Sequence, residues 1–131
     1  MHINIKFEKV IPTDKQIQQL YLFLKEREYS ISHVKIPSKI EHTSFVINHP
    51  YIAWYLVFKE DNQKLISSTY LKDDNTIGIN LISGYENCFT KIVDFIKINH
   101  KPLPAIKSVR RKNFTVSISS GNSKLIELLH S

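Results

Sequence analysis

Three short apolar runs follow one another in the middle of the chain: "IAWYLVF" at 52–58, "KLISSTYL" at 64–71 and "TIGINLI" at 76–82. Each is rich in β-branched and aromatic residues, which pack well on a pleated sheet. The separators, "KEDNQ" at 59–63 and "KDDN" at 72–75, are short and rich in Asp and Asn, which favour tight turns. The sequence therefore predicts three antiparallel strands joined by hairpins.

Elements of two kinds are predicted before these strands. Residues 3–10, "INIKFEKV", alternate apolar and polar side chains and predict a half-buried strand. Residues 14–28 predict a helix, because an apolar stripe recurs there at helical spacing. Pro37 interrupts the next stretch, and a shorter second helix is expected at 38–48.

Further elements are predicted after the three strands. The stretch "LISGYENCFTKIV" at 81–93 joins the third strand to a helix that runs to about residue 99. A basic connector broken by prolines leads to a strand at 113–119, and a last helix starts in "GNSKLIELLH" at 121–130. The order is β-α-(α)-β-β-β-α-β-α in one domain of 131 residues. This order predicts an α+β fold, an α/β sandwich with a mixed, mostly antiparallel sheet.

Composition limits the classes of protein to which the chain can belong. No apolar run approaches the ~18 residues that span a bilayer, and the N-terminus carries charges where a signal peptide needs an apolar block. The single cysteine, Cys88, excludes an internal disulfide. The six histidines are scattered without the spacing of metal ligands. We expect a cytoplasmic protein without a metal site.

Positive charge is concentrated in one part of the chain. The formal net charge is +6, and residues 95–126 contain seven basic residues and no acidic residue. Four of the seven lie in "KSVRRK" at 107–112, which includes Arg110 and Arg111. A solvated loop, a clamp for a phosphorylated ligand and a nucleic-acid patch all fit this cluster. No aromatic residue interleaves it, which argues against binding of single-stranded nucleic acid.

Three segments share a pattern with a known family. They are "HPYIAWYLVF" at 49–58 with the two strands after it, the strand-to-helix junction at 83–91, and "VSISSGNSKLIELL" at 116–129. Together they resemble the GNAT superfamily, whose members transfer an acyl group from acyl-CoA to an amine. The resemblance implies acetyl-CoA as co-substrate and an amine of a small molecule or a protein as acceptor.

The resemblance also assigns residues to acetyl-CoA. The third strand of the meander would pair with the pantetheine arm, and the junction would hold the diphosphate at a helix N-terminus. Asn122 would hydrogen-bond the pantetheine, although helix N-capping explains this residue equally well. The basic segment would compensate for the scarcity of glycine in the junction. The implied binding residues are Leu81, Ile82, Ser83, Asn87, Cys88, Phe89, Thr90, Lys91, Asn122, Arg110 and Arg111.

The chain departs from the family pattern at several positions. The family junction reads Gln/Arg-x-x-Gly-x-Gly/Ala, whereas this chain has Glu86 and Phe89 near those positions. A carboxylate repels a diphosphate, and a phenyl ring obstructs its approach to the backbone. Leu129 replaces the Tyr or Phe of the last motif, and the family's final hairpin would begin at about Ser131. The latter departure predicts an exposed sheet edge.

Four residues are candidates for the chemistry of acyl transfer. His42 and His49 are expected beside the acceptor cleft and titrate near neutral pH, so either could take the proton of the amine. Tyr70 and Asn80 are polar residues on strands expected to face that cleft. Each also has an ordinary explanation, as a surface histidine or a polar sheet residue.

Three functions are therefore considered from the sequence. The first is a working N-acetyltransferase. The second is a catalytically degenerate GNAT-fold protein that binds a ligand or a partner, as a homodimer sealed along the exposed edge. The third is a nucleic-acid-associated module that uses the basic segment. The fold does not choose among them, because one fold hosts many functions.

Overall fold

The computed structural model describes residues 4–30, 37–82 and 84–119. The elements within these residues are β1 (Ile5–Lys9), α1 (Asp14–Ser30), α2 (Lys39–Asn48), β2 (Ala53–Lys59), β3 (Leu65–Leu71), β4 (Thr76–Leu81), the short 3₁₀ turn η1 (Glu86–Cys88), α3 (Phe89–Asn99) and β5 (Thr115–Ser119). The predicted order up to the last strand and the α+β class are confirmed. Ser83 and the predicted last helix with Asn122 lie outside the described residues.

The strands form one sheet in the order β1-β2-β3-β4-β5. Successive pairs from β1 to β4 are antiparallel, whereas β5 lies parallel to β4, with α3 in the connection between them. The register places Trp54 beside Tyr70 and Tyr70 beside Gly78, so these three residues lie side by side across three strands. The ladder between β4 and β5 continues to Asn80 and Ser119.

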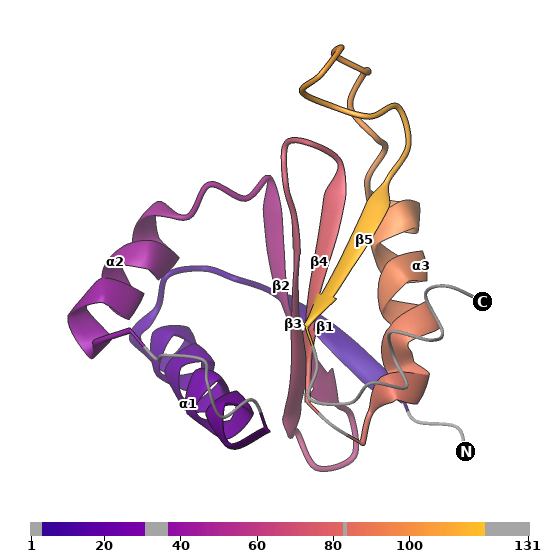
Figure 1. Ribbon diagram of the computed structural model, residues 1–131. Coiled ribbons are helices and arrows are strands. Elements are labelled where there is room, and N and C mark those ends of the chain that lie inside the picture. The colour runs from indigo at the N-terminus through magenta and orange to yellow at the C-terminus, as the bar shows by residue number, and fades with distance from the viewer. Residues whose placement is uncertain (1–3, 31–36, 83, 120–131) are drawn as a thin grey trace.

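Helices cover both faces of the sheet (Figure 1): α1 and α2 lie on one face and α3 on the other. On the first face, Trp54 and Leu56 pack with residues of both helices, including Val46 of α2. On the second face, Val57 and neighbouring strand residues pack against Ile92 of α3. Every helix in the described part of the chain is too short or too polar to cross a lipid bilayer.

Local signals determine where several elements begin and turn. The Ser38 hydroxyl accepts the N–H of Glu41 at 3.2 Å, and the Glu41 carboxylate accepts the N–H of Ser38 at 3.3 Å. This reciprocal pair caps the start of α2. The two hairpin turns each contain a residue with a left-handed backbone, Gln63 with φ 59° and Asn75 with φ 68°. The hairpins predicted from the Asp- and Asn-rich separators are therefore present.

Asn75 also ties the basic connector to the sheet. Its side chain is buried, and its Nδ2 donates to the carbonyl oxygens of Leu103 at 2.9 Å and Arg111 at 2.7 Å. Its Oδ1 accepts the N–H of Leu103 at 2.7 Å. The connector is therefore fastened near both of its ends to the turn between β3 and β4.

Candidate functional site

A cavity of about 140 Å³ lies between the first helical layer and the sheet. Its walls come from α1, α2, the segment before β2, and strands β2 to β4. The lining residues are Leu20, Phe23, Leu24, His42, Phe45, Tyr51, Trp54, Ser68, Tyr70 and Asn80. We call it the aromatic cavity. Three of the four catalytic candidates proposed from the sequence line it, namely His42, Tyr70 and Asn80.

Tyr70 is held between a second aromatic ring and the backbone of β4. Its ring stacks on Tyr51 with centroids 4.1 Å apart and planes 13° from parallel. A Cβ atom added to Gly78 would lie 2.0 Å from Cζ of Tyr70. Glycine at position 78 therefore lets the Tyr70 ring lie directly against β4. Sequence analysis predicted that Tyr70 faces a cleft but gave no signal for this packing.

His42 joins the two helices on the cavity wall. Its Nε2 lies 3.1 Å from the carbonyl oxygen of Ile17, which can only accept, so Nε2 carries the hydrogen. The side chain is 4 % exposed. Burial lowers the pKa of His42, and the hydrogen bond to Ile17 offsets part of this effect. Nδ1 is then the ring atom that can take up a proton.

His49 lies behind the wall instead of on it. Its Nδ1 accepts the N–H of Tyr51 at 3.2 Å. Its ring packs on Tyr51 and against Trp54, with centroid distances of 5.5 and 5.1 Å. Burial lowers the pKa of His49. His49 supports the residues that line the cavity, and the structure does not bring it to the cavity surface.

The remaining polar groups of the cavity lie on the sheet. Asn80 Nδ2 donates to Ser68 Oγ at 3.4 Å. Trp54 Nε1 is buried and has no hydrogen-bond acceptor among the described residues. Burial, with a smaller contribution from Tyr70, raises the pKa of Tyr51 to about 12, so its hydroxyl stays protonated at neutral pH. Tyr51 and Ser68 were not proposed as site residues from the sequence, because their approach to the cavity depends on strand register.

The end of β4 is the predicted contact with the pantetheine arm. The N–H of Ile82 donates to the carbonyl of Ile66 at 3.1 Å, so it points toward β3. Backbone direction alternates along a strand, so the peptide groups of Leu81 point toward the β5 side. The described β4–β5 ladder runs to the pair of Asn80 and Ser119, where the described residues end. Of the two predicted positions Leu81 and Ile82, Leu81 is the one whose peptide groups point toward β5.

In the junction after β4, a carboxylate of the junction itself binds to the backbone. Gly84, with φ 102°, donates its N–H to both carboxylate oxygens of Glu86, at 3.0 and 2.8 Å. The N–H of Cys88 donates to Tyr85 at 2.9 Å, and the N–H of Phe89 donates to Glu86. These peptide groups therefore have internal partners where the resemblance implied an open diphosphate cradle. Glu86, whose charge was expected to repel a diphosphate, thus contacts the junction backbone directly.

The side chains proposed for the junction differ in exposure. Cys88 is buried beneath α3, and burial raises the pKa of its thiol, which disfavours a reactive thiolate. Phe89 is partly buried against the same core. Asn87 and Thr90 are exposed, and Lys91 is half-buried.

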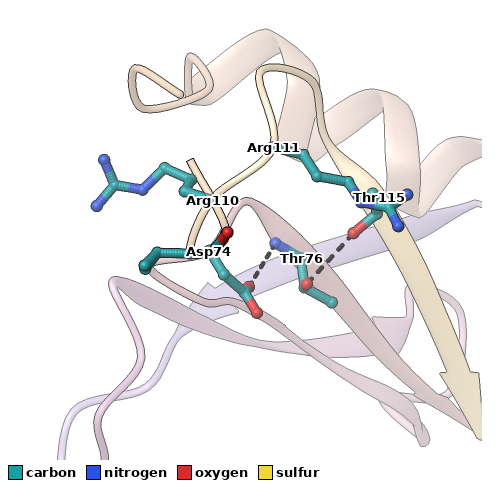
Figure 2. Close-up of a pocket in the computed structure, with 7 residues that line it drawn as sticks. Asp74, Thr76, Arg110, Arg111 and Thr115 are labelled. Atoms are coloured by element: carbon teal, nitrogen blue, oxygen red, sulfur yellow. Dashed lines mark hydrogen bonds between the residues drawn. The ribbon is translucent and has the colours of Figure 1, made fainter. Parts of the chain in front are cut away.

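The basic connector between α3 and β5, which contains Arg110 and Arg111, lies at the opposite end of the sheet from the junction (Figure 1). With Thr76 and Thr115 at the starts of β4 and β5, the two arginines line a cavity of about 390 Å³, which Figure 2 shows. Strand β4 separates this cavity from the junction. Its six residues make five steps of about 3.3 Å, which is about 17 Å from the first residue to the last. The junction and these two arginines were predicted to hold the phosphates of acetyl-CoA together. In the described residues they lie too far apart to form one clamp.

Arg110 has a structural role in this second cavity. Its Nε donates to the carbonyl of Asp73 at 2.6 Å and its Nη1 to that of Pro104 at 3.0 Å. The first bond holds the basic connector against the turn before β4, and the second lies within the connector. Asp74 stands on the same wall, and hydrogen bonds from Thr76 lower the pKa of its carboxyl. The cavity is therefore of mixed charge.

Metal chemistry has no candidate centre in the described part of the chain. No three side chains of His, Cys, Asp or Glu come together there in a way that could hold an ion.

Comparison with known proteins gives similarity to solved structures at low sequence identity. No protein family and no curated protein matches the sequence. One similar solved structure is an aminoglycoside acetyltransferase from an uncultured soil metagenomic sample in complex with sisomicin, with 11% identity, a TM-score of 0.44, and coverage of 88% of this chain and 76% of that chain. Another is a possible acetyltransferase from Clostridium difficile 630, with 11% identity, a TM-score of 0.41, and coverage of 89% and 78%.

Proposed function

We propose that this chain is a GNAT-like N-acyltransferase that transfers an acetyl group from acetyl-CoA to a primary amine bound in the aromatic cavity. One observation carries the proposal: His42, Tyr70 and Asn80, which were expected from the sequence at the acceptor cleft, line a single cavity. Asn80 stands one residue before Leu81, the backbone position that faces the expected pantetheine side.

The chemistry requires three events at the thioester. The amine nitrogen attacks the carbonyl carbon, so a C–N bond forms and the C–S bond breaks. The amine loses a proton, and the departing thiolate gains one. His42 Nδ1 would accept the first proton, and the Tyr70 hydroxyl would supply the second. Asn80 Nδ2 would hydrogen-bond the carbonyl oxygen as negative charge develops on it. Proton exchange with water then restores both side chains.

The junction fits acetyl-CoA only in part. The peptide groups of Leu81 point toward β5, the side on which the pantetheine arm would lie, whereas the Glu86 carboxylate accepts the N–H of Gly84. Binding of the diphosphate at this point would require Glu86 to turn away from Gly84. We therefore expect weak binding of acetyl-CoA that strengthens when the charge of Glu86 is removed.

Two measurements test the transferase. Acetyl-CoA should raise the melting temperature of the protein, because a ligand that binds only the native state stabilises it. Release of the CoA thiol should depend on both an amine and the hydroxyl of Tyr70. Absence of any thermal shift at millimolar acetyl-CoA, in the wild type and in Glu86→Gln alike, would remove the proposal.

A second candidate function is favoured by the bond between Glu86 and Gly84. Under it, the protein binds a small ligand in the aromatic cavity without turning over acetyl-CoA, and the junction is permanently closed by its own carboxylate. Neither the wild type nor Glu86→Gln would then release CoA thiol, while the cavity would still bind ligand. The homodimer expected with this alternative is tested separately by the mass of the protein in solution.

A further inference from the structure

The basic connector between α3 and β5 projects beyond the end of the sheet (Figure 1). Within it, Ile106 and Arg110 pair as an isolated antiparallel bridge and close a small loop, residues 106–110, which we call the connector loop. Two aliphatic side chains of this loop face solvent, because Ile106 is 46 % exposed and Val109 is 67 % exposed. Exposed apolar side chains that cluster on a projecting segment indicate a contact surface.

Positive charge accompanies the aliphatic pair. Residues 101–112 contain no acidic residue and five basic ones, namely Lys101, Lys107, Arg110, Arg111 and Lys112. Arg110 donates to backbone carbonyls, whereas the other four side chains are exposed and make no ion pair or hydrogen bond with the described residues. The turn between β3 and β4 carries two carboxylates beside the connector, and Lys72 pairs with one of them at 3.9 Å. The end of the sheet is therefore positive overall.

The backbone of the connector loop satisfies several of its own polar groups. The N–H of Ile106 donates to the carbonyl of Arg110 at 3.0 Å, and the N–H of Arg110 donates to the carbonyl of Ile106 at 2.8 Å. The N–H of Val109 donates to that same carbonyl at 3.0 Å. Peptide groups with partners lose less free energy than unpaired ones when water is removed from around them. The loop can therefore enter a medium poor in water at a reduced cost.

The loop is also held in position from both sides. The Asn75 side chain binds the backbone of Leu103 before the loop and of Arg111 after it. The Nε of Arg110 adds a bond to the carbonyl of Asp73. A segment that is ordered before it meets a partner loses less conformational entropy on binding.

We propose that the connector loop docks on an anionic phospholipid surface. Ile106 and Val109 enter the boundary between headgroups and acyl chains, and the four exposed cations lie at the headgroups. An apolar insertion combined with basic residues is the means by which peripheral segments bind anionic membranes. Duplex nucleic acid would engage the cations through its phosphates, but those contacts do not use the aliphatic pair. The loop contributes no residue to the aromatic cavity, so this inference does not rest on the proposed function.

Sedimentation of the full chain with phospholipid vesicles tests the docking. One set of vesicles contains phosphatidylcholine and phosphatidylserine in equal amounts, and the other contains phosphatidylcholine alone. We expect saturable binding to the first set that weakens as salt is added, because salt screens the headgroup charge. Binding to the second set should be at least about tenfold weaker, since each cation near an anionic surface contributes about fivefold. Absence of binding to the anionic vesicles at millimolar lipid would overturn the proposal.

A pair of double variants tests the insertion of the aliphatic side chains. Ile106→Ser with Val109→Ser should weaken binding to the anionic vesicles by at least about tenfold, because the buried apolar area is lost. The matched control is Ile40→Ser with Ile98→Ser, which alters isoleucines that are 84 % and 82 % exposed on α2 and α3. The control should bind as the wild type does. Wild-type binding by the first variant would show that the loop does not insert, which would overturn the proposal.

A second pair of variants tests the position of the charge. Lys107→Gln with Lys112→Gln should weaken binding by about 25-fold, at about fivefold for each cation. Lys15→Gln with Lys39→Gln removes the same charge at the starts of α1 and α2 and should have a much smaller effect. Equal losses in the two variants would show that net charge, and not this surface, governs binding.

A duplex DNA oligonucleotide provides the comparison with nucleic acid. We expect its binding at physiological salt to be weaker than binding to the anionic vesicles. Tighter binding of the DNA that is unaffected by Ile106→Ser with Val109→Ser would assign the surface to nucleic acid and overturn the lipid assignment.

Discussion

Both carboxylate oxygens of Glu86 lie within hydrogen-bonding distance of the Gly84 nitrogen, at 3.0 and 2.8 Å. The Glu86 side chain thus accepts the hydrogen bond from a backbone N–H that a bound diphosphate would need as a donor. The contact depends on glycine, because the backbone of Gly84 has φ 102°, a conformation that other residues rarely adopt. The charge at this position should therefore control how strongly the junction binds an anion.

Glu86→Gln should strengthen the binding of acetyl-CoA. The amide removes a negative charge beside the expected diphosphate, an effect of about 1 kcal/mol, or about fivefold in affinity, for unit charges about 4 Å apart in water. Calorimetric titration with acetyl-CoA measures the change. Asp94→Asn, which removes the same charge from the exposed side of α3, should leave the affinity unaltered. Equal affinities of the wild type and Glu86→Gln would show that this contact does not govern binding.

Gly78→Ala should disrupt the aromatic cavity. The added methyl group would lie 2.0 Å from Cζ of Tyr70, so the ring must leave β4 and lose its stacking on Tyr51. We expect a loss of about 1–3 kcal/mol in the free energy of unfolding. Urea denaturation measures this loss, and ligand binding in the cavity should fall with it.

Gly84→Ala is the matched control for the effect on the cavity. Its methyl group meets no atom within 4 Å, but the positive φ should still cost stability, about 1–3 kcal/mol. Cavity binding should survive in this variant. If both glycine variants bind cavity ligands equally, the packing of Tyr70 on Gly78 does not shape the site.

Stability should fall as the pH drops below 6.5, the ordinary histidine value. Burial lowers the pKa of His42 in the folded protein, so between the folded pKa and 6.5 the unfolded chain binds more protons. Stability therefore rises with pH across that window and is fully present above 6.5. Denaturant unfolding as a function of pH measures the slope.

His42→Gln should reduce the dependence of stability on pH, because the titrating imidazole is removed. The glutamine amide can still donate to the carbonyl of Ile17. His49 and His100 also have pKa values lowered mainly by burial, so their Gln variants should remove further parts. An identical slope in the wild type and all three variants would contradict the assignment of neutral, buried histidines.

Asn75→Gly should loosen the basic connector. Glycine keeps the positive φ of the turn but removes the three side-chain hydrogen bonds to Leu103 and Arg111. At about 1 kcal/mol for each bond, we expect a loss of about 3 kcal/mol in stability. Amide exchange in the connector should accelerate. Gln63→Gly, at the left-handed position of the other hairpin, should be nearly neutral and serves as the control.

The order of elements could be predicted from the sequence because local periodicity and turn residues determine it. The runs at 52–58, 64–71 and 76–82 alternate or branch as strands do, and their Asp- and Asn-rich separators form the hairpins. Tyr70 and Asn80 were expected to face the acceptor cleft because of the family resemblance, and both line the aromatic cavity.

The packing within the cavity depends on strand register, which a single sequence does not specify. Trp54, Tyr70 and Gly78 become neighbours only through the pairing of three strands. The separation of Arg110 and Arg111 from the junction follows from topology. A parallel crossover returns the chain to the start of the neighbouring strand, away from the end where the junction begins.

The most direct test of the central claim compares Tyr70→Phe with Tyr55→Phe in acetyl-CoA-dependent release of CoA thiol, with a panel of small-molecule primary amines. Each variant loses one phenol hydroxyl, but Tyr55 bonds to His100 at 2.8 Å on the opposite face of the sheet. The account predicts turnover by the wild type, a loss of about a hundredfold in Tyr70→Phe, and near wild-type turnover in Tyr55→Phe. Equal rates in the two variants, or no thiol release by the wild type with any amine, would contradict it.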